Sequence, residues 1–296
     1  MNTQHTRQTG TTLMQNDYIL TVSCPDRTGI VHAVSGLLLE LNGNILDSQQ
    51  YGDEETQRFF LRIHFSVDAD LSQDDITLKF IPLGEQFNMT WKLHDARKKA
   101  RVLIMVSKQG HCLNDLLFRA NSGSLPIEIV AVVSNHRDFE RLATGYGIPF
   151  HYLPVTPDTK PEQEKQVLAL VENHKADVVV LARYMQILSD HFCRALEGRA
   201  INIHHSFLPS FKGARPYHQA HARGVKIIGA TAHYVTADLD EGPIIAQDIE
   251  QVDHTMSANE LTRVGSDIES LVLSRAVKYH VEHRILLNNH RTIIFR

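Results

Sequence analysis

The sequence has few of the features that mark secreted, disulfide-bonded or membrane proteins. Its three cysteines, Cys24, Cys112 and Cys193, are far apart and odd in number. They exclude a closed disulfide framework, show no zinc-binding spacing and favour a reducing compartment. No apolar run approaches the roughly 20 residues that cross a bilayer, and the polar stretch 1–17 lacks the apolar core of a signal peptide. We therefore expect a cytoplasmic protein that does not bind membranes.

The sequence also lacks an excess of basic charge. It has 30 Lys and Arg against 34 Asp and Glu, a net charge of -4, which gives no broad attraction for nucleic acid. The basic run within 94–101 is short and has no interleaved aromatic residues, so we interpret it as a solvated linker. A length of 296 residues with 43% hydrophobic residues predicts about two globular domains.

The first domain is expected at 17–94, after a disordered tail at 1–16 that is rich in Thr, Gln and Asn. Apolar spacing and turn residues predict six elements in the order β-α-β-β-α-β, which is that of ferredoxin-like folds. These elements are a strand at 18–24, a helix at 29–42, strands at 45–51 and 58–67, a helix at 74–87 and a strand at 89–93. A linker at 95–100 follows.

The second domain is expected at 101–296. Short apolar runs alternate with amphipathic segments there, which predicts a mostly parallel sheet covered on both faces. The expected strands are 102–106, 127–133, 150–155, 178–181 and 200–204, and the expected helices are 111–121, 138–145, 161–174 and 190–197. Longer strands at 227–235 and 243–252, a helix of nearly thirty residues from 257 and a hairpin at 285–295 complete it. The fold class is thus α/β, a ferredoxin-like domain followed by a doubly wound, Rossmann-like domain.

The strand at 200–204 carries two polar side chains on one face. Residues two apart on a strand point the same way, so Asn202 and His204 lie together while Ile201 and Ile203 pack on the other face. Ligands of open α/β sheets bind beyond the carboxyl ends of the strands. An amide there can stabilise an oxyanion, and an imidazole can move protons near neutral pH. The alternative is that Asn202 caps the loop and His204 is a satisfied buried histidine.

A carboxylate in the loop at 236–243 is the second candidate. Asp240 can orient and charge-stabilise a histidine, as a carboxylate does in a catalytic triad. The competing interpretation is an ordinary turn aspartate before a Gly-Pro pair. The pair His204 and His205 is a weak metal candidate, because neighbours on a strand point apart and no third ligand is placed by the sequence.

The loop at 107–114 follows the first strand of the second domain, where α/β proteins often hold phosphates. It has a single glycine, Gly110, and is therefore a poor phosphate cradle. Cys112 lies near the start of the next helix, a position that can lower the pKa of a thiol. A small packed residue is the preferred interpretation of Cys112.

Taken together, these motifs resemble the formyltetrahydrofolate-dependent formyltransferase family over residues 101–283. The motifs are Asn202-x-His204, the stretch 206–213, Asp240 before Gly-Pro-Ile-Ile, and the segment 178–189 with the sequence VVVLARYMQILS. Residues 18–93 resemble an ACT domain, a ferredoxin-like module that senses small molecules, and Asp26-Arg27-x-Gly29-Ile30 matches its usual entry to the first helix.

The resemblance implies an enzyme that uses water to hydrolyse 10-formyltetrahydrofolate to formate and tetrahydrofolate, with no metal or cofactor. Formate would then supply purine biosynthesis and balance the one-carbon folate pools. Asn202, His204 and Asp240 match the family's catalytic residues. The residues that match its folate pocket are Leu181, Met185, Gln186, Ile187, Leu188, Val235, Thr236, Ala237 and Asp238.

Two departures from the family pattern bear on the acceptor. His205 follows the catalytic histidine, where many relatives have Pro or Ala. The loop 108–112 replaces the Gly- and Ser-rich phosphate loop of relatives that formylate glycinamide ribonucleotide, which favours water as the acceptor. The alternatives are a formyltransferase with an amine acceptor and a protein that senses amino acids and folate without turnover.

The ACT resemblance implies regulation and assembly. Such modules usually pair across subunits, so we expect a homo-oligomer, a dimer or a tetramer. An amino-acid effector such as glycine or methionine is expected near Asp26, Gly29 and Asn44. The alternative is a purely structural dimerisation module.

Overall fold

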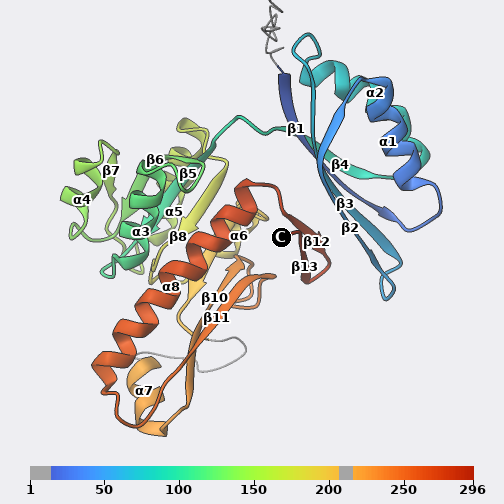
Figure 1. Ribbon diagram of the computed structural model, residues 1–296. Coiled ribbons are helices and arrows are strands. Elements are labelled where there is room, and N and C mark those ends of the chain that lie inside the picture. Colours follow the sequence, from blue (N-terminus) through green and yellow to red (C-terminus); the bar gives the residue numbers. More distant parts are fainter. Residues whose placement is uncertain (1–14, 207–215) are drawn as a thin grey trace, which may run out of the picture. The chain divides into compact units, whose positions relative to one another are not determined.

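Separate hydrophobic cores divide the chain into two units, and the boundary along the sequence lies between Lys98 and Lys99. The computed structural model describes residues 15–206 and 216–296 (Figure 1). Residues 1–14 of the predicted disordered tail and residues 207–213 of the family motif lie outside the described residues. The two units are described in turn.

The first unit is a four-stranded antiparallel sheet in the order β2-β3-β1-β4. Its strands are β1 (Gln15–Pro25), β2 (Asn44–Asp53), β3 (Arg58–Asp68) and β4 (Thr90–Asp95), and its helices are α1 (Ile30–Glu40) and α2 (Gln73–Gln86). Both helices lie on one face of the sheet (Figure 1). Alternation places Leu20 and Val22 in the core beside Phe65 and Phe80. The ferredoxin-like order predicted from the sequence is confirmed.

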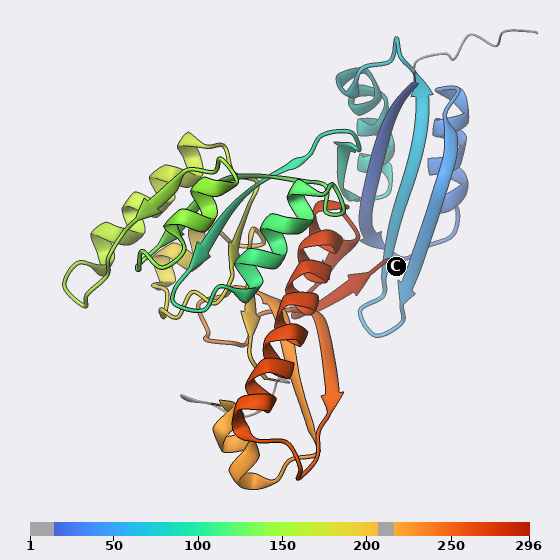
Figure 2. The ribbon, with the colours of Figure 1, turned by 60° about the vertical axis from the view of Figure 1, so that its left-hand side comes forward.

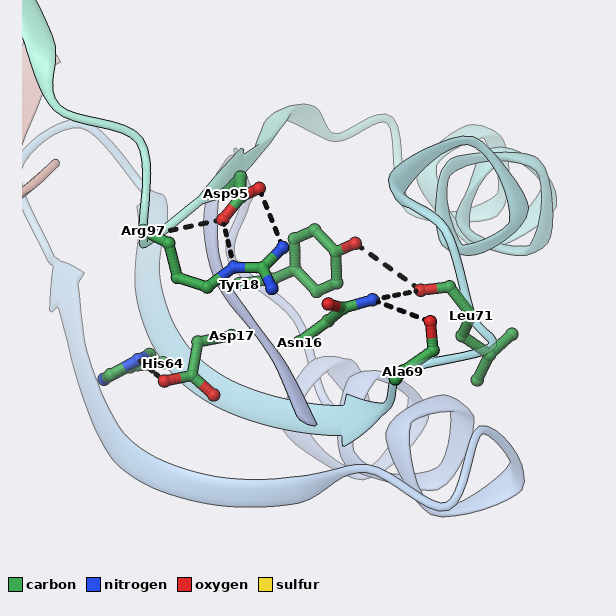
Figure 3. A network of polar contacts seen from close by, with 8 residues as sticks. All are labelled: Asn16, Asp17, Tyr18, His64, Ala69, Leu71, Asp95 and Arg97. Atoms are coloured by element: carbon green, nitrogen blue, oxygen red, sulfur yellow. Dashed lines mark hydrogen bonds and ion pairs between the residues drawn. The ribbon is translucent and has the colours of Figure 1, made fainter. Parts of the chain in front are cut away.

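Strand β1 begins earlier than predicted. Gln15 and Asn16, which we expected in the disordered tail, pair with Asp68 and Val67 of β3. The Asn16 side-chain amide donates hydrogen bonds to the carbonyl oxygens of Ala69 and Leu71, at 3.1 and 3.0 Å (Figure 3). A polar composition suggested a tail, but pairing with a long partner strand extends β1 through these residues.

Strand β4 likewise runs into the segment predicted as a linker. Asp95 is its last residue and pairs with Tyr18 of β1. The Asp95 carboxylate accepts from the Arg97 guanidinium at 3.0 and 3.1 Å, so part of the basic run is fixed by a local ion pair (Figure 3). Ala100, at the other end of the expected linker, already belongs to the first strand of the second unit.

The second unit is a seven-stranded sheet in the order β11-β10-β9-β8-β5-β6-β7. Its strands are β5 (Ala100–Val106), β6 (Ile127–Ser134), β7 (Phe150–Tyr152), β8 (Val178–Leu181), β9 (Ala200–His204), β10 (Ile227–Tyr234) and β11 (Ile244–Gln251). The strands from β9 to β7 pair in parallel, while β10 and β11 are antiparallel at one edge. This is the mostly parallel sheet predicted from the sequence.

Helices cover both faces of this sheet (Figure 2). They are α3 (His111–Asn121), α4 (Glu140–Gly145), α5 (Lys160–Asn173), α6 (Asp190–Ala195), α7 (Pro216–Arg223) and α8 (Ala258–Val281). Strand residues alternate between two cores: Val178 and Val180 pack in the core shared with α3 and α8, and Val179 and Leu181 in that shared with α5 and α6. These strands are buried on both faces, which explains why their sequences are continuous apolar runs.

Some boundaries differ from the sequence predictions. Helix α7 was not predicted, although Pro216 at its first position and Gly224 just after it, with φ of 64°, are typical helix end signals. Strand β7 ends at Tyr152 rather than at 155. The predicted C-terminal hairpin is formed by β12 (Ile285–Asn288) and β13 (Arg291–Ile294).

Helix α8 is the longest helix of the described chain, with 24 residues, and begins with a capping box. The Ser257 hydroxyl accepts from the Glu260 backbone N–H, and the Glu260 carboxylate accepts from the Ser257 N–H at 2.7 Å. Within residues 15–206 and 216–296, no helix combines the length and the apolar character needed to span a bilayer.

The capping box predicts a measurable loss of stability in Ser257→Ala. The substitution leaves a backbone N–H of the first turn without its acceptor, so we expect the free energy of unfolding to fall by about 1 kcal/mol. Urea denaturation followed by circular dichroism measures it. The matched control is Ser266→Ala on the same helix, whose hydroxyl bonds back to the Thr262 carbonyl and takes no part in the cap. An equal loss in both variants would contradict the capping role.

Candidate active site

The predicted polar residues Asn202 and His204 lie at the carboxyl end of β9, an inner strand of the second sheet. Strand β9 lies between β8, which is parallel to it, and β10, which is antiparallel. Ile201 and Ile203 pack in the core shared with α8, while Asn202 and His204 line a cavity on the other side. His204 is buried and Asn202 is half-buried. The structure thus brings the predicted amide and imidazole to one cavity.

Asp240 reaches this cluster from the turn between β10 and β11. Its carboxylate lies 3.3 Å from His204 Nδ1 through Oδ2, and 3.6 Å from His233 Nε2 through Oδ1. Asp240 has a positive φ of 59°, a left-handed conformation that aspartate tolerates better than most residues. Strand β10, which precedes the turn, carries a second imidazole, His233, and this ring contacts the same carboxylate.

His233 belongs to the site but was not singled out from the sequence. It pairs with Asn202 across β9 and β10, so both side chains lie on one face. Its Nδ1 lies 2.9 Å from the Tyr234 carbonyl oxygen, which can only accept, and we therefore assign the proton to Nδ1. Its Nε2 faces Asn202 Nδ2 at 3.2 Å and Asp240. The ring thus accepts from the amide and lies in contact with the carboxylate.

The Asp240 carboxyl is held as an anion. Burial alone would raise its pKa, but the contacts with the His204 and His233 rings outweigh burial and hold the pKa well below its usual range. A carboxylate in this state is a weak proton acceptor and a strong hydrogen-bond acceptor. Asp240 is therefore suited to orienting a donor, either the imidazole or a water molecule.

The cavity beside this cluster has a volume of about 300 Å³. Asn202, His204, His233 and Asp240 are among its polar lining residues. All nine residues predicted for the folate pocket also line it: Leu181, Met185, Gln186, Ile187, Leu188, Val235, Thr236, Ala237 and Asp238. An apolar cavity with a few converging polar groups is typical of a site for a small organic molecule.

Two buried polar residues of α5 hold the loop 182–189, which forms one side of the cavity. The Gln163 amide donates to the Tyr184 hydroxyl at 3.0 Å, and the Glu164 carboxylate accepts from the Ser189 backbone N–H at 2.9 Å. At the β5 end, the Ser107 hydroxyl accepts from the Met185 backbone N–H at 3.1 Å. The loop is thus fixed at three points while the Met185 side chain stays exposed to a ligand.

His205 and Cys112 are both buried and uncharged. Burial, together with the nearby Arg183 and His204, lowers the pKa of His205 to about 4, so the ring is neutral at physiological pH. Cys112 is fully buried in the core beneath α3, and burial raises the pKa of its thiol far above its usual value. This placement agrees with the packed role preferred from the sequence.

The described residues contain one compact group of metal-ligating types, His111, Cys112 and Glu269, whose ligand atoms all lie within 4.8 Å of one another. The Cys112 thiol stays protonated, and the Arg183 guanidinium lies 3.3 Å from Glu269 Oε2. A protonated thiol and an adjacent guanidinium both oppose a bound cation. The group therefore does not fit a metal site.

The three residues predicted for an effector site do not meet within one chain. Asp26 follows β1, and Gly29, with φ of 92°, precedes α1 without a capping side chain. Asn44 begins β2 and pairs with Ser66, whereas Arg58 marks the other end of β3, next to Asp26. Arg58 and Ser66 are eight residues apart, about 26 Å along a strand. A site with all three residues would need two copies of the chain.

Comparisons with known proteins place both units in families. A model of the ACT domain matches residues 18–74, and a model of the formyl transferase family matches residues 100–277. Formyltetrahydrofolate deformylase of Corynebacterium sp. (strain P-1) is 52% identical over 281 residues, which cover 94% of this chain and 98% of that protein. This chain belongs to the formyltetrahydrofolate deformylase family.

Solved structures agree with this assignment. The crystal structure of the formyltetrahydrofolate deformylase from Burkholderia mallei ATCC 23344 has a TM-score of 0.91 and 51% identity, and the match covers 95% of this chain and 100% of that one. A glycinamide ribonucleotide transformylase from Symbiobacterium toebii has a TM-score of 0.62 and 28% identity over 67% of this chain and 95% of its own. The deformylase likeness thus spans both units.

The turn that carries Asp240 predicts a strong effect of Gly242→Ala. A methyl group at Gly242 would lie 1.7 Å from the Tyr234 carbonyl oxygen, so the turn must move away from β10. We expect a loss of at least about 2 kcal/mol in the free energy of unfolding, measured by urea denaturation.

The control for this prediction is Gly145→Ala in α4, where an added methyl group meets nothing within 4 Å. That variant should be neutral or slightly stabilised, since alanine is the better helix former. A Gly242→Ala protein as stable as the control would show that the turn is not packed against β10 as described.

Proposed function

We propose that this chain hydrolyses 10-formyltetrahydrofolate to formate and tetrahydrofolate. The observation that carries the proposal is the contact of Asp240 with His204, at 3.3 Å, beside Asn202 and at one end of the apolar cavity, in a chain of the deformylase family. The pterin would lie against the apolar residues of the loop 182–189, with backbone groups of 235–238 satisfying its polar edge. The formyl group would then reach the polar end.

The proposed reaction proceeds by attack of water on the formyl carbon. The Asn202 amide and protonated His204 stabilise the tetrahedral oxyanion, since both present N–H donors to the same end of the cavity. Asp240 accepts a hydrogen bond from the attacking water and stabilises the charge on His204. As the bond from carbon to N10 breaks, N10 gains one proton of the water molecule, and the other is lost when formic acid ionises.

We also propose that this reaction needs no metal or cofactor and takes place in the reducing cytoplasm. The residues at the polar end supply oxyanion donors and an orienting carboxylate, which acyl transfer to water requires. The one compact group of metal-ligating types among the described residues does not fit a cation, for the reasons given above. Cys24, Cys112 and Cys193 are all buried free thiols, as a reducing compartment allows.

The test is incubation of the purified full-length chain with 10-formyltetrahydrofolate and no other substrate. We expect formate and tetrahydrofolate in equal amounts, measured by NMR of a ¹³C-labelled formyl group. Asn202→Ala and His204→Ala each remove one oxyanion donor and should lower kcat by about 10²–10³. The matched control His254→Ala removes an exposed imidazole outside the cavity and should retain full activity.

Two results would contradict this function. Formate release only after addition of an amine acceptor would favour a formyltransferase. Folate-dependent quenching of Trp91 fluorescence without any product would favour a binding protein. Near-normal turnover of folded His204→Ala would remove the role assigned to that imidazole.

We further propose that the ACT unit binds a small amino acid, glycine or methionine, between two copies of the chain in a dimer or tetramer. Asp26 and Gly29 of one copy and Asn44 of another would form the site, because they lie too far apart in one copy. The edge strand β2 supports pairing: it exposes Ile45 and Leu46, with relative exposures of 40% and 49%. The uncapped start of α1 offers N–H groups to a carboxylate.

Isothermal titration of the full-length chain with each amino acid tests this site. We expect saturable binding by one of them and at least a tenfold weaker Kd, about 1.4 kcal/mol, in Asn44→Ala. Analytical ultracentrifugation should show a dimer or a larger assembly. The control is Asn121→Ala, at the exposed end of α3. A monomeric chain that binds neither amino acid would contradict both the assembly and the effector site proposed for the ACT unit.

A further inference from the structure

A second cavity lies beside the candidate active site, and the two share a wall. It has a volume of about 390 Å³ and is lined by the loops after β5 and β6 and by residues of α7 and α8. Four residues line both cavities and form the shared wall: Arg183, Met185, Gln186 and His205. A volume of several tens of Å³ holds one water molecule, so this space is far larger than the hydrolytic water needs.

Arg183 is the most constrained part of that wall. It is 6% exposed, and its φ of 64° is a left-handed conformation that glycine adopts without strain. Its Nε and Nη2 both donate to Gln109 Oε1, with Nε at 2.9 Å, and Nε lies 3.3 Å from Glu269 Oε2. Backbone strain retained at one position points to a functional demand on the side chain there.

Glu269 anchors the guanidinium from α8. It is 1% exposed, and its carboxylate accepts from the Tyr217 hydroxyl at 2.6 Å and contacts His111 Nε2 at 2.7 Å. Burial would raise its pKa, but the His111 hydrogen bond and the Arg183 charge lower it, so Glu269 remains an anion. Glu269 is thus a buried carboxylate whose two oxygens both have polar partners.

His205 connects this wall to the reacting groups. Its ring centroid lies 4.8 Å from that of His204, and it is 9% exposed. The neutral His205 ring and the charged Arg183 side chain therefore stand between the second cavity and the polar end of the first. Any acceptor seated in the second cavity would have to pass them to reach a formyl group beside Asn202.

We propose that Arg183, held by Gln109 and Glu269 and backed by His205, selects water as the acceptor by keeping amines in the second cavity away from the formyl carbon. The inference rests on the proposed function and names the residues that set its acceptor. Without the wall, the nitrogen of a primary amine would attack the formyl carbon as the bond to N10 breaks. The amine would lose the proton that N10 gains, and a formamide would replace formate.

The test is competition between water and a primary amine in Arg183→Gly. Glycine fits the positive φ at this position, and Glu269 keeps Tyr217 and His111 as partners, so the variant should fold. The full-length protein is incubated with 10-formyltetrahydrofolate, labelled with ¹³C in the formyl group, and an excess of glycinamide. NMR gives the ratio of N-formylglycinamide to formate. We expect this ratio to rise at least about tenfold over the wild type, as for other steric selections between substrates.

A second variant and a control make the result decisive. Gln109→Ala removes the acceptor of both guanidinium contacts from an exposed loop position, so it should fold and give an intermediate ratio. The control Lys175→Gly also replaces a cationic residue at positive φ with glycine, but at an exposed position outside both cavities. It should keep the wild-type ratio, which separates acceptor choice from a general effect of removing charge.

Three outcomes would overturn the inference. The first is an unchanged ratio in folded Arg183→Gly, or in Gln109→Ala if Arg183→Gly does not fold. The second is loss of both products in Arg183→Gly while folate binding is retained, which would give Arg183 a part in the reaction itself. The third is ready formation of N-formylglycinamide by the wild type. Absence of formate from the wild type without amine is a distinct result, because it would overturn the proposed function and the premise of this inference.

Discussion

The contact between the Asp240 carboxylate and two imidazoles is the constraint on which the site depends. His204 comes from β9 and His233 from β10, and their nitrogens lie 3.3 and 3.6 Å from the two carboxylate oxygens. A single anion can meet both rings only because β10 runs antiparallel to β9 and turns back at Gly242. The antiparallel edge of an otherwise parallel sheet is therefore what assembles the cluster, and the parallel part supplies the rigid strand end and the loop 182–189.

The sequence could predict contacts between residues of one strand, but not contacts between residues that lie far apart along the chain. Alternation along a five-residue strand sufficed to place Asn202 and His204 on one face, because the side-chain period of a strand is local. Asp240 is 36 residues further along the chain, and only the resemblance to a family linked it to His204. His233 was missed because its role follows from its register with Asn202, which no local pattern specifies.

The same limit explains the other misses. Gln15 and Asn16 lie in a stretch with a composition typical of a tail, yet β3 is long enough to pair with them. Helix α7 was missed because it is too short to show a clear apolar period, and its end signals, Pro216 and Gly224, were not used to predict it. The effector site at Asp26, Gly29 and Asn44 stays a prediction, because the family pattern does not state which residues share one copy. The register of β2 and β3 shows that Asn44 lies at the opposite end of the sheet.

Asp240 and Glu269 of the second unit both have a lowered pKa although burial acts strongly against it, and their surroundings differ in a way that separates their roles. Burial opposes ionisation in both cases and is outweighed by partners. Glu269 is 1% exposed, with Tyr217, His111 and Arg183 saturating its oxygens. The Asp240 side chain is 21% exposed, and its contacts to the imidazoles are longer. A perturbed pKa marks both residues, but only the carboxylate with unused acceptor capacity, open to a cavity, can bind an attacking water molecule. Glu269 is suited instead to fixing the guanidinium beside it.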